Sequence, residues 1–384
     1  MTDETRANLS GMRVDHVGSL LRPESLKATF MRYAEGKASG EELRRAQDAG
    51  IRDVVTKQEA HDLPVVTDGE YRRLNWQVSF SDVEGWELWT RSGEGLRRYP
   101  DHRRPGEKPL DRGEDAVVTF RTPATARLRL IRNRPLEEYQ FTRAAASRPV
   151  KLTLIGPDRI CQMFDAAASR AIYPDPDSFL ADVVSIEQRM LGELVEAGCD
   201  YVQIDEPSYT GYVDPPTLER LRAGGEDPTK HLERAIDADN RIIAGLPGAT
   251  FGLHICRGNR ASMWHREGTY DAIAERLFTG LNYHRLLLEY DSERAGTFEP
   301  LRFVPRGKIA VLGLITTKTG RVETADELKR RLEAASRYLP LEQLALSPQC
   351  GFASGMAGNL LTEAEQWRKL DVMLETARQV WGQL

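Results

Sequence analysis

A histidine and a cysteine lie two positions apart in the apolar segment TFGLHICRGN, at His254 and Cys256. The segment is typical of a β-strand, in which side chains two apart point to the same face. One imidazole and one thiolate therefore meet at one point, and this soft pair of ligands favours zinc. Two further candidates end similar segments, since Glu289 follows RLLL and Cys350 follows LALSPQ. Together the four residues predict a zinc site far from zinc-finger spacing, which is typical of catalysis.

The ligand types indicate what such a zinc would do. Zinc with two thiolate ligands is electron-rich and a poor Lewis acid for activating water, but it suits a further thiol held as a nucleophilic thiolate at neutral pH. A displaceable carboxylate such as Glu289 would supply the open position that a catalytic zinc needs. Asp291 lies on the same face of that strand and is the alternative carboxylate. The pattern therefore indicates alkyl transfer to a zinc-bound thiolate.

Other polar residues also stand at the ends of apolar segments. They are His16, Gly18 and Ser19 after the first segment, Asp68 and Glu70 after the second, and Asp205 and Glu206 after the fourth. We predict that Glu70 and Asp205 hold the ammonium group of an amino-acid thiol by charge-assisted hydrogen bonds. The two remaining cysteines, Cys161 and Cys199, are interpreted as small buried hydrophobic residues.

Eight short apolar segments must position these residues. They cover residues 13–19, 63–70, 149–157, 199–207, 249–258, 284–291, 308–315 and 341–351. Amphipathic stretches at 41–62, 175–198 and 324–339 lie between them and predict helices. Alternating strands and helices imply a parallel sheet, and eight units favour a (β/α)8 barrel whose active site lies at the C-terminal strand ends. An open doubly wound sheet is the alternative, but no GxGxxG follows the first strand.

Residues 76–148 do not fit the repeat. The segment is rich in Trp and Arg and later resumes with the β-like stretches VVTFRT and ARLRLIR. We interpret it as a long excursion after the second strand that forms hairpins over the barrel mouth, within a single domain spanning 1–384. Closure over a substrate, docking of a corrinoid protein and a homo-oligomer interface are three roles that the sequence leaves open.

Composition restricts the class of protein. The chain has 384 residues, 40% of them hydrophobic, and a net charge of −5, which argues against nucleic acid as the main partner. No window approaches the roughly 20 apolar residues that span a bilayer, and the polar N-terminus carries no secretory signal. Four cysteines in a chain of this length do not make a disulfide framework. We therefore expect a cytoplasmic enzyme that acts on small molecules, with no nucleic-acid or membrane partner.

Eight motifs resemble one known family. In chain order they are HVGSLLRP, VTDGEYRR, LIGP, QIDEP, HICRGN, LLLEYDSERAG, LGLITTKTGRVETADEL and LSPQCGF, and together they are similar to cobalamin-independent methionine synthases. The resemblance covers nearly the whole chain except 76–148. It implies a (β/α)8 barrel whose Zn²⁺, bound by His254, Cys256, Glu289 and Cys350, activates homocysteine for methylation. It also implies that Gly18, Ser19, Glu70 and Asp205 contact the thiol substrate, a set to which we add His16.

The chain departs from the family in two respects. Full-length members have two barrels, so this chain is expected to correspond to the C-terminal catalytic barrel alone, and methyl-folate cannot be assumed as the donor. Lys318 stands where full-length members have a histidine thought to handle protons, so we treat Lys318 as a catalytic candidate with that role in doubt. Short relatives take methyl groups from corrinoid proteins or open epoxides with coenzyme M.

The leading hypothesis is a zinc-dependent homocysteine methyltransferase. The first alternative keeps the zinc and changes the thiol to coenzyme M or another small thiol. A sulfonate-bearing thiol would favour Arg or Lys near the site. Arg22 is close in sequence to Ser19, and Arg72 and Arg73 are close to Glu70, so this alternative stays open. A zinc hydrolase is disfavoured because it predicts His- and Asp-rich ligands. A protein with only a binding or structural role has no need of these strand-end residues.

Overall fold

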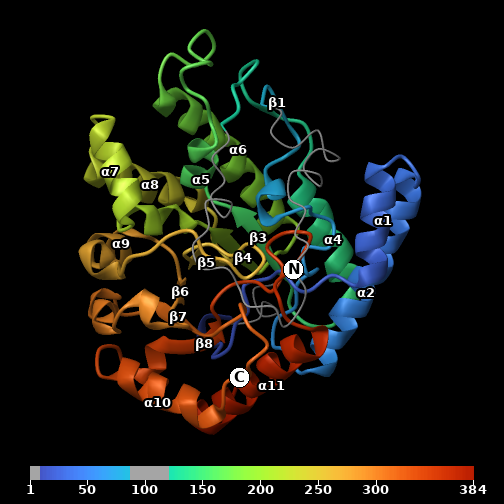
Figure 1. The fold of residues 1–384 in the computed structure, drawn as a ribbon, viewed down its shortest axis with the longest axis vertical. Coiled ribbons are helices and arrows are strands. Elements are labelled where there is room, and N and C mark those ends of the chain that lie inside the picture. Colours follow the sequence, from blue (N-terminus) through green and yellow to red (C-terminus); the bar gives the residue numbers. More distant parts are fainter. Residues whose placement is uncertain (1–8, 87–120) are drawn as a thin grey trace.

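A parallel sheet of six strands forms the centre of the computed structural model, which describes residues 9–86 and 121–384 (Figure 1). The strands are β3 (Lys151–Ile155), β4 (Tyr201–Asp205), β5 (Thr250–Ile255), β6 (Arg285–Glu289), β7 (Ile309–Ile315) and β8 (Leu344–Pro348). Each pairs with its neighbour in chain order. Every residue of these strands is buried except Thr250, as expected for a parallel sheet covered on both faces. The last six predicted strands are therefore confirmed.

The first two apolar segments close the sheet with a few hydrogen bonds each. Val14 pairs in parallel with Leu346 of β8, and Val66 pairs in parallel with Val150 before β3. Between the two segments, Leu20 N donates to Gly69 O at 3.2 Å. The first and second units thus lie along the two edges of the six-stranded sheet, the positions that the predicted (β/α)8 barrel requires.

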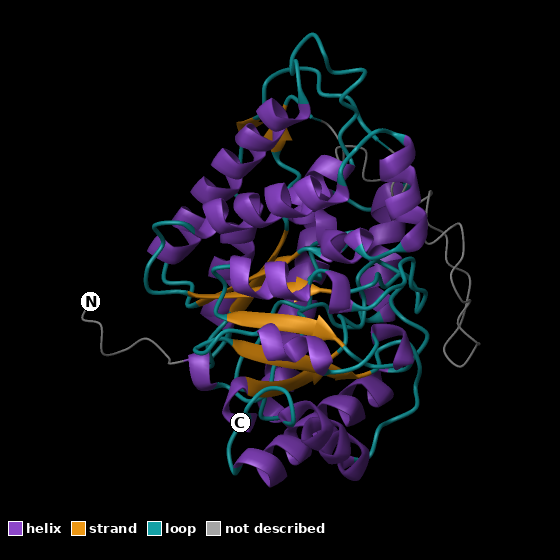
Figure 2. Ribbon diagram, turned by 90° about the vertical axis from the view of Figure 1, so that its left-hand side faces the viewer, coloured by secondary structure: helices purple, strands orange, loops and turns teal. Residues whose placement is uncertain are grey.

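Helices surround the sheet, as Figure 2 shows from the side. They are α1 (Glu24–Ala34), α2 (Gly40–Ala60), α4 (Arg134–Ala145), α5 (Pro157–Gln162), α6 (Pro176–Glu196), α7 (Pro215–Ala223), α8 (Pro228–Ile243), α9 (Ala274–Gly280), α10 (Ala325–Ser336) and α11 (Glu363–Trp381). The three amphipathic stretches named above form α2, α6 and α10. Two of these helices, α2 and α10, begin at capping boxes, which Ser39 makes with Glu42 and Thr324 makes with Glu327. Among the described helices, none is long and apolar enough to cross a lipid bilayer.

The excursion after the second strand differs from the prediction. Its last part, predicted as hairpin, forms the regular helix α4, which begins at an Asn133 cap and packs against α2, α6 and β3. The described β-structure is one short antiparallel pair, β1 (Val83–Glu84) with β2 (Arg129–Leu130). The ARLRLIR stretch supplies β2, whereas most of VVTFRT and all of 87–120 lie outside the described residues. A helical unit was hidden here because α4 has almost no amphipathic periodicity.

A polar network fills the barrel interior below the strand ends. The Asp15 carboxylate accepts hydrogen bonds from Lys151 Nζ at 2.7 Å and Arg285 Nε at 3.2 Å. Burial opposes ionisation, but these two cations lower the pKa of Asp15 to about 2. Lys151 Nζ also donates to Gln203 Oε1 at 2.9 Å, and Gln203 Nε2 donates to Asp205 Oδ1 at 2.7 Å. The network therefore leads from the barrel floor to a carboxylate at the C-terminal end of β4.

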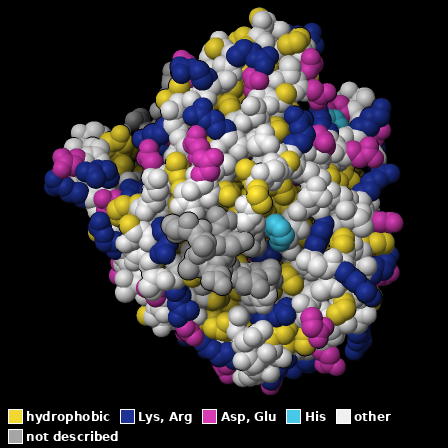
Figure 3. Space-filling model, turned by 180° about the vertical axis from the view of Figure 1, so that it is seen from behind, with side chains coloured by type: hydrophobic (Ala, Val, Ile, Leu, Met, Phe, Trp, Pro, Cys, Tyr) yellow, Lys and Arg dark blue, Asp and Glu magenta, His cyan; other side chains and the backbone are white. Residues whose placement is uncertain are grey.

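The outer surface carries mixed charge. On the described part of the face shown in Figure 3, Lys and Arg side chains alternate with Asp and Glu. Neither sign gathers there into a continuous patch. Mixed charge on this face agrees with the small net charge of the chain.

Candidate metal centre and substrate cavity

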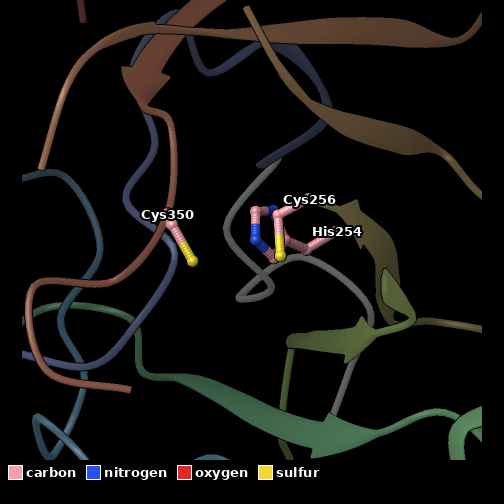
Figure 4. A group of neighbouring side chains, drawn as sticks. All are labelled: His254, Cys256 and Cys350. Carbon is pink, nitrogen blue, oxygen red and sulfur yellow. The ribbon is translucent and has the colours of Figure 1, made fainter. Parts of the chain in front are cut away.

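Three of the four predicted zinc ligands come together at the C-terminal ends of the strands. His254 and Cys256 lie on and just after β5, and Cys350 lies just after β8. One ligand atom from each residue lies within 4.8 Å of the others. Figure 4 shows the Cys350 sulfur pointing across toward the His254–Cys256 pair. All three residues are buried, and among the described residues they make the one group of this kind.

The donor set fits zinc. Imidazole and two thiols are soft N and S ligands that select zinc over the hard cations magnesium and calcium. Both ring nitrogens of His254 are buried, and neither has a hydrogen-bond partner among the described residues. A buried polar atom without a partner is costly, so a metal bond to one of these nitrogens would remove that cost. His254, Cys256 and Cys350 would thus hold the ion.

The three groups shift one another's ionisation. The neighbouring Cys256 thiol and the His254 charge lower the pKa of Cys350 well below its usual value, although burial opposes this. Interaction with the Cys350 sulfur, together with burial, raises the pKa of Cys256. Burial disfavours the imidazolium, but the neighbouring Cys350 sulfur outweighs it and raises the pKa of His254. These shifts favour the thiolate form at Cys350 over Cys256.

The fourth predicted ligand, Glu289, lies beside this group and is bound to other residues. Its carboxylate accepts hydrogen bonds from Arg257 N at 2.6 Å and from Arg294 Nη2 at 2.5 Å. Burial opposes ionisation, but Arg294 and Arg257 keep the pKa of Glu289 low, so the group is an anion. Its charge also raises the pKa of Cys256. Its role as a ligand stays a prediction, and so does the alternative role of Asp291, which pairs with Arg294 at 3.3 Å.

The two predicted ammonium-binding carboxylates line the same cavity as the three zinc ligands. This cavity has a volume of about 150 Å³, and Glu70 and Asp205 form part of its wall. Glu70 has a positive φ of 60°, next to Gly69 at 66°, a conformation that costs a non-glycine residue about 1 kcal/mol or more. Glu70 Oε2 is buried and has no hydrogen-bond partner among the described residues. A strained backbone thus places an unsatisfied carboxylate oxygen in the wall of the cavity.

Asp205 should make the folded state pH-sensitive. Burial raises its pKa from 3.8 to about 7, so the folded protein keeps a proton that the unfolded chain loses between these values. This group therefore lowers the free energy of unfolding as pH rises through that window. Asp205→Asn should stabilise the metal-free protein more at pH 8 than at pH 5, by roughly 2–3 kcal/mol, in urea titrations. An equal gain at both pH values would contradict the raised pKa.

The three candidates from the first apolar segment, His16, Gly18 and Ser19, differ in their relation to the cavity. Ser19 lines the cavity, and Ser19 O accepts from Phe352 N at 2.9 Å. Gly18 has a φ of 133° and lies so close to Thr153 that an added Cβ would be 2.7 Å from its Cγ2. His16 does not line the cavity, and its Nε2 lies 3.1 Å from Val65 O. Burial and the Lys151 charge lower the pKa of His16 to about 4, so it is neutral. Substrate contacts by these residues stay predictions, and Ser19 is placed best for one.

Sequence comparison decides which family these features belong to. Residues 120–379 match the family described as "Cobalamin-independent synthase, Catalytic domain". The chain belongs to this family. It is 37% identical over 373 residues to the uncharacterized protein YxjH of Bacillus subtilis (strain 168), covering 96% of this chain and 94% of YxjH. It is 25% identical over 373 residues to the methionine synthase of Pyrococcus abyssi, covering 96% and 92% of the two chains.

Solved structures of cobalamin-independent synthases share the fold. A Listeria monocytogenes protein assigned provisionally as a vitamin-B12 independent methionine synthase aligns with a TM-score of 0.73 and 28% identity, over 96% of this chain and 98% of that one. A B12-independent methionine synthase from Shewanella sp. W3-18-1, solved with selenomethionine, aligns with a TM-score of 0.68 at 20% identity, over 96% and 97%. The family supports a methyltransferase with small-molecule substrates.

Lys318 lies outside the cavity wall. It is the residue predicted to stand where full-length cobalamin-independent synthases have a proton-handling histidine. Its Nζ donates to Gly258 O at 3.0 Å and to Asn259 Oδ1 at 3.3 Å. The ammonium is buried and helps to lower the pKa of Cys350 and of Glu289. In this member of the cobalamin-independent synthase family, the geometry supports an electrostatic contribution, and proton transfer by Lys318 stays a prediction.

The three arginines that could have bound a sulfonate-bearing thiol do not line the cavity. Arg22 donates to four backbone carbonyl oxygens, Arg73 to Glu138 and Thr153, and Arg72 to Asp48 at 2.5 Å. Two arginines that sequence reasoning missed, Arg159 and Arg266, line the cavity instead. Arg159 lies two residues after the LIGP motif, and this strand-end position could have indicated it as a site residue. Arg266 lies in an irregular loop that carries no comparable signal.

Proposed function

We propose that the protein methylates the sulfur of homocysteine, with zinc held by His254, Cys256 and Cys350 and with Glu289 as the displaceable carboxylate. The observation that carries the proposal is the joint presence of the N/S donor group and two carboxylates in one cavity. Membership of the cobalamin-independent synthase family supports it independently. A cytoplasmic location belongs to the proposal, because its thiolate ligands require reducing conditions and the four cysteines are free.

In this proposal the zinc ion would activate the substrate sulfur, and the protein side chains would position the substrate. Bound zinc would lower the pKa of the substrate thiol, so that the sulfur is present as a thiolate nucleophile at neutral pH. Glu70 and Asp205 would bind the substrate ammonium, and Ser19 would fix the opposite side of the amino-acid group. Asp205 is itself held by the Gln203 amide, which Lys151 orients. Holding the substrate at two points in this way restricts the direction in which its sulfur meets the donor carbon.

A thiol panel tests the proposal. Homocysteine, cysteine and coenzyme M are added in turn to zinc-loaded protein, and X-ray absorption at the zinc edge reports a new Zn–S bond. We expect homocysteine to add a sulfur and coenzyme M to add none, because Glu70 and Asp205 complement an ammonium and repel a sulfonate. Addition by coenzyme M alone would favour the alternative thiol transferase and overturn the homocysteine proposal. Folded, active protein without metal would overturn the zinc role.

A further inference from the structure

A buried asparagine joins the loop after β5 to the loop after β8, beside the three proposed zinc ligands. Asn259 lies in the same loop as Cys256, and its Nδ2 donates to Gly351 O at 2.7 Å. Gly351 directly follows Cys350. The same Nδ2 donates to Ser354 Oγ at 3.3 Å, and that hydroxyl lies 3.9 Å from the Cys350 sulfur. One side chain thus connects the segments that carry the two cysteine ligands.

Lys318, in the loop after β7, fixes the orientation of this amide. Its Nζ donates to Gly258 O at 3.0 Å, to Asn259 Oδ1 at 3.3 Å and to Met263 O at 3.5 Å. An ammonium has three donors and no acceptor, so the side of the amide that faces it must be the oxygen. The nitrogen of Asn259 then points the other way, toward Gly351 O. All three donors of Lys318 are directed to the one loop that follows β5.

The residue before Cys350 is bonded to the same loop after β7. Gln349 Oε1 accepts from Thr317 Oγ1 at 2.5 Å and from Thr317 N at 3.3 Å. Asn359 Nδ2 donates to Thr317 O at 2.8 Å and to Gly351 O at 3.4 Å. These groups are buried, where an unpaired amide or carbonyl is costly, so the bonds favour one arrangement of the segment. Cys350 is therefore held through its neighbours on both sides.

We propose that Lys318 and Asn259 are positioning residues, which hold Cys350 within reach of a metal ion bound by the other two ligands. The inference rests on the proposed function, because it takes the ion to be zinc. Ligands that are held in place before the metal arrives bind it more tightly, since less chain freedom is lost on binding. Groups that orient metal ligands typically change metal affinity by about 10- to 100-fold when they are removed. Lys318 fulfils this role without transferring a proton.

Asn259→Asp separates positioning from the effect of charge. The aspartate keeps an oxygen that accepts from Lys318, but it places a second oxygen where the amide nitrogen donates to Gly351 O. The added negative charge alone would attract Zn²⁺ and tighten its binding, whereas loss of the bond to Gly351 should weaken zinc binding by about tenfold or more. Competition with a chromophoric chelator measures the zinc Kd of the full chain. Equal or tighter zinc binding in the variant would overturn the inference.

Asn240 provides the matched control. Its side chain makes the same pair of contacts away from the cavity, because Oδ1 accepts from Asn282 N at 2.7 Å and Nδ2 donates to Gly280 O at 2.8 Å. Asn240→Asp should leave zinc affinity unchanged. Urea titration of both metal-free variants measures any general loss of stability. If Asn240→Asp weakened zinc binding as much as Asn259→Asp, the effect would be one of stability, and the positioning role would be wrong.

A second variant covers the case in which Asn259→Asp does not fold by circular dichroism. Asn259→Ser shortens the side chain without adding charge, so neither bond can form, and it should show the same loss of zinc affinity. Wild-type zinc affinity in Asn259→Ser would overturn the inference. Cobalt in place of zinc gives a second readout, because its thiolate charge-transfer band should weaken when Cys350 is no longer held. An unchanged band in a variant would also contradict the positioning role.

The same variants distinguish this inference from the proposed function. Unchanged zinc affinity together with weaker homocysteine binding would make Asn259 a substrate contact and overturn the positioning role alone. Zinc binding that depends on Asn259, without methyl transfer to homocysteine, would refute the proposed reaction and support the positioning role. A wild-type protein that binds no zinc would refute both.

Discussion

Replacing Cys350 with serine should remove bound zinc and methyl transfer together. Zinc-finger peptides hold structural zinc with about 10–16 kcal/mol shared among four ligands, so the loss of one thiolate here should cost several kcal/mol and lower zinc affinity by about 100-fold or more. Cys350 is also the thiol of the group whose ionisation is most favoured, because Cys256 and His254 lower its pKa. Metal analysis after dialysis should find about one zinc per chain in the wild-type protein and a small fraction of that in the variant.

The other two cysteines provide the matched control. Cys161 and Cys199 lie outside the three-residue ligand group, and Cys199 is fully packed in the core. Cys161→Ser should keep both zinc and activity, because it changes the same atom in a less buried part of the fold. If Cys350→Ser retained a full complement of tightly bound zinc, the metal centre described above would be wrong.

Asp205→Asn should weaken homocysteine binding while the metal stays in place. The substitution keeps the shape of the side chain and an oxygen that accepts from Gln203. Burial raises the pKa of Asp205 to about 7 in the empty site, and a bound substrate ammonium would favour the carboxylate form, so the asparagine removes the negative charge that faces this ammonium. A lost charge-assisted hydrogen bond costs about 2–3 kcal/mol, which corresponds to a rise in the Kd of homocysteine of roughly 30- to 150-fold. Isothermal titration of the zinc-loaded variant measures the change, and its zinc content should equal that of the wild type.

A thiol without an amino group separates this effect from general damage. 4-Mercaptobutyrate is homocysteine without its ammonium, so its binding should be unchanged or slightly stronger in Asp205→Asn. Equal weakening of both thiols would mean that Asp205 supports the site structurally and does not recognise the ammonium. Loss of zinc from the variant would lead to the same conclusion.

Most of the barrel could be predicted because its strands are buried on both faces. Continuous apolar runs such as KIAVLGLI and HRLLLEYD are typical of buried parallel strands. The polar residue that ends each run marks the C-terminal end of the strand, where the active site of a barrel lies. His254, Cys256 and Cys350 were found in this way, and the structure brings them together. The family resemblance also follows from these strand-end motifs, and the match over 120–379 confirms it.

The features that the sequence did not reveal depend on three-dimensional context. Helix α4 has no amphipathic stripe, so its periodicity could not distinguish it from an irregular excursion. Glu289 ends a strand as predicted, but its hydrogen bonds to Arg257 N and Arg294 come from neighbouring segments that no spacing rule relates. Arg22, Arg72 and Arg73 are close in sequence to predicted site residues and yet are held elsewhere, whereas the cavity arginines come from helix α5 and from the loop after β5.

The position of Cys350 has a consequence for how the protein is made. His254 and Cys256 leave the ribosome well before β8, and Val14 can pair with Leu346 only once β8 exists. For the proposed zinc enzyme, a nascent chain would carry an incomplete, two-ligand site that binds metal weakly, and tight binding would begin when the last strand docks. Metal would then be acquired only after β8 is made, and a chain that stops before β8 would leave cellular zinc to other proteins.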